Sequence, residues 1–144
     1  MMGGVTSSNR VRNLTKEYPS SSDVFRHLLN KLIVAGGERW IHFDGPKKEA
    51  WVEVANDLND FLELNFSFPF KGNPQELFAK NQIVVPNDWK LIQYKPKRLG
   101  GFFAGYACYS IPKNSSDSLL PFIDDLFLKL FACAKDYPVS GYLT

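Results

Sequence analysis

The side chains best suited to metal binding or nucleophilic chemistry are few and far apart in this 144-residue chain. Its two histidines are His27 and His42, and its two cysteines are Cys108 and Cys133. None of them stands in the CxxC or HExxH spacing that brings zinc ligands together. Both thiols fall in predicted secondary structure, where we expect buried small side chains and no disulfide. We predict neither a metal ion nor another cofactor.

A thiol nucleophile or an acid pair would need partners that the sequence pattern does not provide. A cysteine attacks as its thiolate, which forms near neutral pH only beside a base or a positive charge. Cys108 lies between Ala107 and Tyr109 in a predicted strand, where packing is the usual role. Asp124 and Asp125 are adjacent on a predicted helix and do not share a face. We predict no catalytic residue, and a small enzyme built around Cys108 or a histidine stays an alternative.

The glycine-rich, basic stretch over 90–105 resembles two kinds of anion site. Gly100 to Gly105 lacks the Gly-Lys-Ser/Thr ending of a phosphate-binding loop and lies between two predicted strands. Basic residues alternate with aromatic ones, as in proteins that bind single-stranded nucleic acid. They are Lys90, Lys95, Lys97 and Arg98. Because 17 basic against 15 acidic residues leave a net charge of only +2, we predict an exposed hairpin tip over 96–101 and no nucleic acid partner.

Large aromatic side chains and clustered acidic ones favour protein recognition. Acidic residues gather around the second and third predicted strands and basic ones at the hairpin tip, and such unlike patches suit a specific encounter between proteins. Aromatic residues make up 15% of the chain, and those that the core does not hold are typical interface anchors. The predicted partner-binding residues are Trp40, Trp51, Glu53, Asp57, Asp60, Tyr106 and Tyr109.

Apolar periodicity predicts the elements that position these residues. Residues 1–20 are rich in Ser, Asn and Gly, which is typical of a flexible arm. Apolar residues then recur at helical spacing from Ser21 until Gly36-Gly37. Three stretches with period-two alternation predict strands over 39–44, 49–56 and 61–68.

The second half of the chain predicts two more helices and a hairpin. Asn73 before Pro74 is a capping signal for a short helix, and an extended connector follows over 83–88. The remaining elements are strands over 89–95 and 102–111 and a long helix over 119–134 that Tyr137-Pro138 ends. We predict a single α+β domain over 21–144, with helices packed on an antiparallel five-stranded sheet in the order α-βββ-α-ββ-α.

Hydropathy predicts neither a membrane-spanning nor a secreted chain. No run of about 18 apolar residues is present, and the first residues lack the apolar centre of a secretory signal. We therefore expect a cytoplasmic protein without a membrane partner.

Three stretches carry a resemblance to a known fold. They are the apolar first helix that ends at Gly36-Gly37, the strand opening Trp40-Ile41-His42-Phe43 and the final helix around 122–127. With the order of elements over roughly 22–143, they resemble the small secretion-chaperone fold shared by class I type III secretion chaperones and the YbjN-like, TY-Chap group of bacterial proteins. The resemblance implies binding of a protein partner without catalysis, often as a homodimer, and carries over no site residue.

Three functions stay open on these observations. The leading hypothesis is a non-catalytic, chaperone-like module that holds a polypeptide with its sheet and its aromatic residues. An immunity protein is the second, in which acidic side chains block the active site of a toxin. Those side chains are Glu53, Asp57, Asp60 and Glu63. The third is the small enzyme already described.

Overall fold

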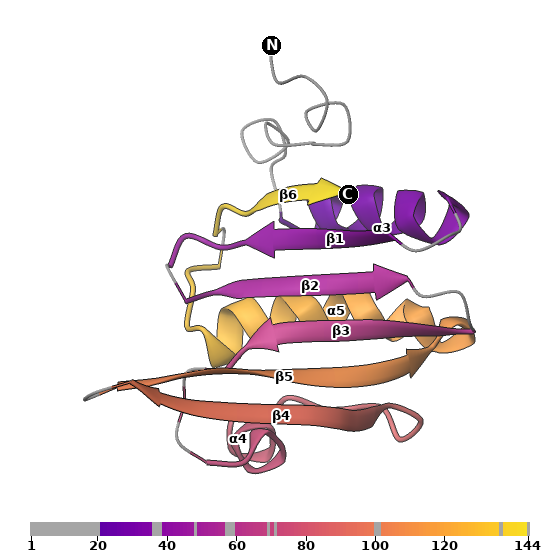
Figure 1. Cartoon of the computed structure of the whole chain (residues 1–144). Helices are drawn as coiled ribbons and strands as arrows, with labels where there is room; N and C mark the ends of the chain where they lie inside the picture. The colour runs from indigo at the N-terminus through magenta and orange to yellow at the C-terminus, as the bar shows by residue number, and fades with distance from the viewer. Residues whose placement is uncertain are drawn as a thin grey trace.

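Figure 1 shows the computed structural model, which describes residues 21–35, 39–47, 49–56, 60–68, 70, 72–99, 102–135 and 137–143. The predicted arm over 1–20, the glycine pair at 36–37 and the centre of the hairpin tip at 100–101 lie outside the described residues. The helices and strands, in chain order, are α3 (Ser21–Ala35), β1 (Arg39–Asp44), β2 (Trp51–Asn56), β3 (Phe61–Ser67), α4 (Pro74–Lys80), β4 (Lys90–Leu99), β5 (Phe102–Pro112), the 3-10 turn η1 (Lys113–Ser118), α5 (Leu119–Asp125), the π-helical turn η2 (Leu126–Leu130) and β6 (Ser140–Leu143).

The strands form one antiparallel sheet in the order β4-β5-β3-β2-β1-β6. The prediction of an α+β fold with an antiparallel sheet is confirmed. The predicted count of five strands is wrong, because β6 adds a sixth strand beside β1. β6 has the four residues Ser-Gly-Tyr-Leu, which show no regular apolar–polar alternation, and it is held by long-range pairing such as that of Leu143 with Ile41.

The edge formed by β6 depends on a glycine. A Cβ atom at Gly141 would lie 2.6 Å from Leu28 Cδ1 of α3 and 3.0 Å from Phe43 Cδ1 of β1. Both neighbours are fully buried, so neither side chain has open space into which it can move. The absence of a side chain at this position lets α3 pack closely on the sheet.

The capped helix and the connector agree with their sequence patterns. The Asn73 side chain accepts a hydrogen bond of 2.8 Å from the Gln75 N–H at the start of α4. Residues 83–88 contain no strand. The connector buries Ile83, packs Val85 against the core and leaves Val84 81% exposed, so alternate apolar side chains anchor it to the core.

The β4–β5 hairpin is longer than predicted. The chain over 96–99 was expected in the tip, yet it continues β4, with Pro96 opposite Gly105 and Leu99 opposite Phe102. Proline is tolerated there because β4 is at the edge of the sheet, where one side of its backbone has no neighbour among the described strands. A bulge between Leu91 and Gln93 shifts the register, and with it the face on which later side chains of β4 lie.

The predicted helix over 119–134 is helical only through Leu130, and its last residues, 131–134, are wrong. After α5 the backbone widens into η2, where the Phe131 N–H donates to the Leu126 carbonyl at 2.8 Å, and Ala132 then has a φ of 55°. Lys47 Nζ, from the turn between β1 and β2, donates to the carbonyl oxygens of Phe131 and Ala132 at 2.9 and 3.0 Å. A side chain distant in sequence thus satisfies the helix end, which periodicity alone does not predict.

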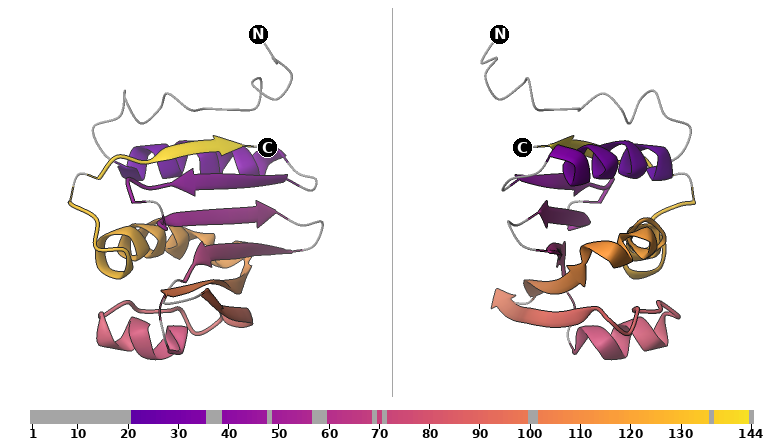
Figure 2. Two further views of the ribbon diagram at one scale, coloured as in Figure 1. Left: turned by 60° about the vertical axis from the view of Figure 1, so that its left-hand side comes forward. Right: turned by 90° about the vertical axis from the view of Figure 1, so that its right-hand side faces the viewer.

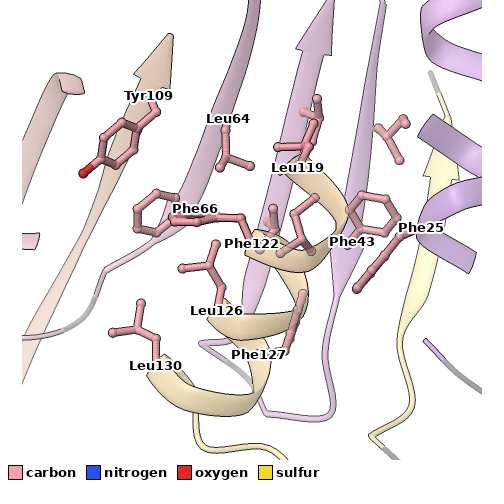
Figure 3. Close-up of a cluster of buried hydrophobic side chains, with 14 of the residues drawn as sticks. Phe25, Phe43, Leu64, Phe66, Tyr109, Leu119, Phe122, Leu126, Phe127 and Leu130 are labelled. Carbon is pink, nitrogen blue, oxygen red and sulfur yellow. The ribbon is translucent and has the colours of Figure 1, made fainter. Parts of the chain in front are cut away.

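The three helices lie on one side of the sheet, as the turned views in Figure 2 show. None of these described helices is long and apolar enough to span a bilayer. Side chains of α5 and η2 point at the sheet in Figure 3, among them Phe127 beside Phe25 of α3. The Phe127 ring stacks on Phe25 with centroids 5.8 Å apart and on Tyr137 at 5.0 Å. This ring joins both long helical segments and the last connector in one core.

Replacing Phe127 by alanine tests that packing. Phe127 is fully buried, so Phe127→Ala should lower the free energy of unfolding by about 3–5 kcal/mol through lost burial and a new cavity. Urea unfolding followed by tryptophan fluorescence measures the change. Phe61→Ala is the matched control, since Phe61 is 44% exposed and should cost far less. Equal losses in the two variants would contradict the core described here.

Candidate functional site: the open face of the sheet

The face of the sheet turned away from the helices is the candidate site, and we call it the open face. Successive residues of a strand point to opposite faces of the sheet. Ile41, Val52 and Leu64 are buried against the helices, so the residues next to them in each strand point to the open face. Among the described elements, none packs over it (Figure 2). Its side chains come from Trp40, His42, Asp44, Trp51, Glu53, Ala55, Phe61, Glu63, Asn65, Ser67, Lys90, Gln93, Lys95, Tyr106, Cys108 and Ser110.

Large aromatic rings stand on this open face. Trp40 is 38% exposed and Phe61 44% exposed, both toward the same end of the strands. Trp51 and Tyr106 lie half-buried toward the other end, and the Tyr106 hydroxyl donates to Gln93 Oε1 at 3.3 Å. Apolar ring surface therefore meets solvent at both ends of the face.

His42 is the centre of a cluster on β1 and β2. His42 Nε2 lies 2.9 Å from Asp44 Oδ1, and His42 Nδ1 lies 3.4 Å from Glu53 Oε2. The Trp51 indole stacks on the imidazole, with centroids 5.8 Å apart and planes 20° from parallel. The β1–β2 register places His42 directly opposite Glu53, so backbone pairing builds this contact.

The two carboxylates favour the protonated imidazole. The hydrogen bond with Glu53 is the largest influence and raises the pKa of His42 above its ordinary value of 6.5. Burial acts in the opposite direction, and the hydrogen bond and charge of Asp44 raise the pKa further. Only an imidazolium can donate from both ring nitrogens to two acceptors.

Charge divides the open face into two parts. The β1–β3 part carries the carboxylates of Asp44, Glu53 and Glu63, and the β4 edge carries Lys90 and Lys95. Because alternate residues of a strand point to the same face, the acidic side chains lie together over β1–β3 and the basic ones lie along β4. The open face is therefore acidic over β1–β3 and basic at β4.

The structure brings most of the predicted partner-binding residues together. Trp40, Trp51, Glu53 and Tyr106 share the open face, and Asp60 is exposed just before β3. Asp57 lies outside the described residues.

Tyr109, predicted as a partner-binding residue, does not lie on this surface. It is 1% exposed and stacks on Phe66 with ring centroids 6.2 Å apart on the helix-covered face. Its neighbour Cys108 points to the open face, and adjacent strand residues cannot share a face.

The open face also holds His42, Asp44 and Phe61, which were not predicted as partner-binding residues. Their alternation with buried residues was a usable signal, because His42 and Asp44 fall at the same parity as Trp40. The contact between His42 and Glu53 depends on the register of two strands, which the sequence pattern does not specify.

Cys108 lies on the open face yet is only 3% exposed. Burial, with the negative charge of Glu63 as a smaller cause, raises the pKa of its thiol to about 12. The thiol is thus protonated near neutral pH, where a nucleophile would need the thiolate. Within the described part of the chain, no three His, Cys, Asp or Glu side chains are placed to hold a metal ion.

A separate hollow of about 530 Å³ lies at the other side of the molecule, beside α3 and the end of β6. It is lined by His27, Asn30, Lys31, Val34, Arg39 and Leu143. None of the predicted partner-binding residues lines it, so the open face remains the candidate site.

The His42 cluster makes stability depend on pH. The folded-state pKa lies above 6.5, so the stabilisation is complete below pH 6.5 and is lost as the pH rises through the folded-state value. In urea unfolding, wild type should lose more stability between pH 6 and pH 8.5 than His42→Gln does. Parallel pH profiles for the two proteins would contradict the contacts with Asp44 and Glu53.

The Cys108 thiol should react slowly in the folded protein. A Cys133→Ser variant leaves Cys108 as the one thiol of the chain. Its alkylation by iodoacetamide at pH 7.5 should be roughly 100-fold slower when native than in urea, because burial suppresses both thiolate and access. Mass spectrometry over time gives both rates. Rapid labelling of the native protein would instead indicate an activated cysteine.

Comparisons with known proteins find no relative of this chain. The chain matches no protein family, no curated protein and no solved structure. The likeness to secretion chaperones stays a prediction, and the function is inferred from the chemistry of the open face.

Proposed function

We propose that this chain is a non-catalytic module that binds a polypeptide partner through the open face. One observation carries the proposal: a six-stranded sheet has its described helices on one face only, and the other face presents Trp40 and Phe61 at 38% and 44% exposure. Exposed rings of this size lose unfavourable contact with water when a partner covers them.

The arrangement around these rings supports recognition. Interfaces are enriched in aromatic side chains and carry polar groups that set orientation and register. Trp51 is held against His42, which in turn contacts Asp44 and Glu53, so the cluster is ordered before a partner arrives. A preorganised surface loses less side-chain freedom on binding.

The chemistry of the face supports binding over catalysis. The Cys108 thiol is protonated at neutral pH, and both ring nitrogens of His42 are engaged by carboxylates. We therefore propose that the carboxylates of Asp44 and Glu53 contact a partner and do not take part in catalysis.

The proposal extends to a chaperone-like role in the cytoplasm, where the open face holds a polypeptide without altering it. A homodimer belongs to the same proposal, as the resemblance to secretion chaperones implies. The face that the helices leave free offers room for such contacts.

An immunity protein is the second candidate. The observation that favours it is the presence of Glu53 and Glu63 beside Asp44 on one face, which suits a basic active site. It differs from a chaperone in its partner, which would be an active enzyme that this chain inhibits.

Site-specific photo-crosslinking tests the binding face. A benzophenone amino acid placed at position 40 should cross-link the full chain to a protein partner in lysate of its native source, because Trp40 stands on the open face. The same probe at position 84 is the control, since Val84 is 81% exposed but lies in the connector.

The cross-linked product decides between the candidates. A secreted substrate indicates a chaperone-like role, and a toxin whose activity is lost in the complex indicates an immunity protein. Equal cross-linking at positions 40 and 84, or no partner together with a monomer in light scattering, would contradict the proposal.

A further inference from the structure

We infer that the partner segment is cationic: the β1–β3 part of the open face docks a polypeptide stretch whose Lys or Arg side chains pair with Asp44, Glu53 and Glu63. This inference rests on the proposed function and adds the chemistry of the occupant. It commits to one kind of partner, a basic segment with interspersed apolar residues.

The distribution of charge carries the inference. Every formally charged side chain described on the β1–β3 part of the open face is a carboxylate, and His42 is the one residue there that can add positive charge. The overall charge of the chain is +2, so this acidity is local. A polyanion would meet these carboxylates unfavourably, whereas a cationic segment is drawn toward them.

The spacing of the carboxylates suits an extended segment. They lie on three neighbouring strands, which are about 5 Å apart, and alternate residues of an extended chain are about 7 Å apart. Basic residues at every second position can therefore reach more than one carboxylate, and the intervening side chains can turn the other way. The basic β4 edge, with Lys90 and Lys95, disfavours continuation of the same charge pattern across the sheet.

The aromatic residues add a second requirement for the same occupant. Trp51 and Trp40 flank the carboxylates along the strands, and an indole face attracts a guanidinium or ammonium group. Phe61 provides apolar surface next to Glu63 on β3. Arginine with aliphatic neighbours satisfies both the carboxylates and the rings.

His42 couples this docking to protons. A neutral imidazole has one donor and one acceptor, so it cannot satisfy both Asp44 of its own strand and Glu53 of β2. On the other side, β6 pairs its Tyr142 with His42 in the register. A cationic side chain of the partner, bound beside Asp44 and Glu53, replaces the positive charge of the protonated imidazole. Protonation of His42 and binding of the cation therefore compete, so the partner segment should bind more tightly as the pH rises.

The experiment uses the full chain and a defined probe. A fluorescein-labelled 12-residue peptide of alternating arginine and leucine is compared, by fluorescence anisotropy, with one of alternating glutamate and leucine. The arginine peptide should bind, and its Kd should fall roughly twofold to fivefold from pH 6 to pH 8. The glutamate peptide should bind far more weakly at both pH values.

Matched variants locate the binding. Glu53→Gln should raise the Kd of the arginine peptide roughly fivefold at pH 8, and Asp117→Asn, which removes an exposed carboxylate from η1, should leave it unchanged. His42→Gln should abolish the pH dependence while retaining binding. Urea unfolding of each variant confirms that it is folded at the assay temperature.

The outcomes separate the two proposals. Preference for the glutamate peptide, equal effects of Glu53→Gln and Asp117→Asn, or tighter binding at pH 6 would overturn the cationic partner. If cross-linking from position 40 then still captures a protein, the open face binds a partner of other chemistry and the proposed function stands. If position 40 captures nothing as well, both proposals fail.

Discussion

The fold depends on covering one face of a broad sheet with few helical residues. Phe127 shows how this is achieved, because its ring contacts Phe25 of α3 and Tyr137 of the last connector within a layer that no single helix fills. Aromatic rings span the distance between sheet and helices with large buried area and defined edge and stacking contacts. Where a ring presses closest, the backbone is glycine: a Cβ at Gly45 would lie 2.6 Å from Phe127 Cε1.

The packing of one face of the sheet against the helices determines which residues lie on the other face. Once Ile41, Val54 and Leu64 are committed to the helices, their strand neighbours must point away from them. The antiparallel register then brings His42 opposite Glu53. The functional surface is therefore the complement of the packing surface, and a slip of one residue in any central strand would dismantle both.

Local signals predicted the elements that local chemistry forms. The Asn73 cap of α4, the period-two strands over 39–68 and the amphipathic start of α5 needed only neighbours in sequence. The π-helical end of the last helix and the four-residue β6 depend on Lys47 and on β1, which are distant in sequence.

The candidate site was partly predictable for the same reason. Residue type marked Trp40, Trp51, Glu53 and Tyr106, but it also marked Tyr109, whose burial is not evident because the alternation fails around it. Cys108 and its neighbour Ala107 are buried as well as Tyr109, so three consecutive residues of β5 are shielded on both faces of the sheet. When consecutive residues are all buried, the apolar pattern does not show to which face of the sheet each side chain points. The pairing of β5 with β3 shows which residues of β5 point to the open face.

The division of charge across the open face also sets how the molecule acts at a distance. Glu53 on β2 and Lys95 on β4 are three strand spacings apart, about 14 Å, which exceeds the Debye length of about 8 Å at physiological ionic strength. In cell-like salt the charge of Lys95 is therefore largely screened for a partner that contacts Glu53. In dilute buffer the two patches act together as a dipole across the strands, which would turn an approaching charged molecule before contact and make its association rate fall as salt is added.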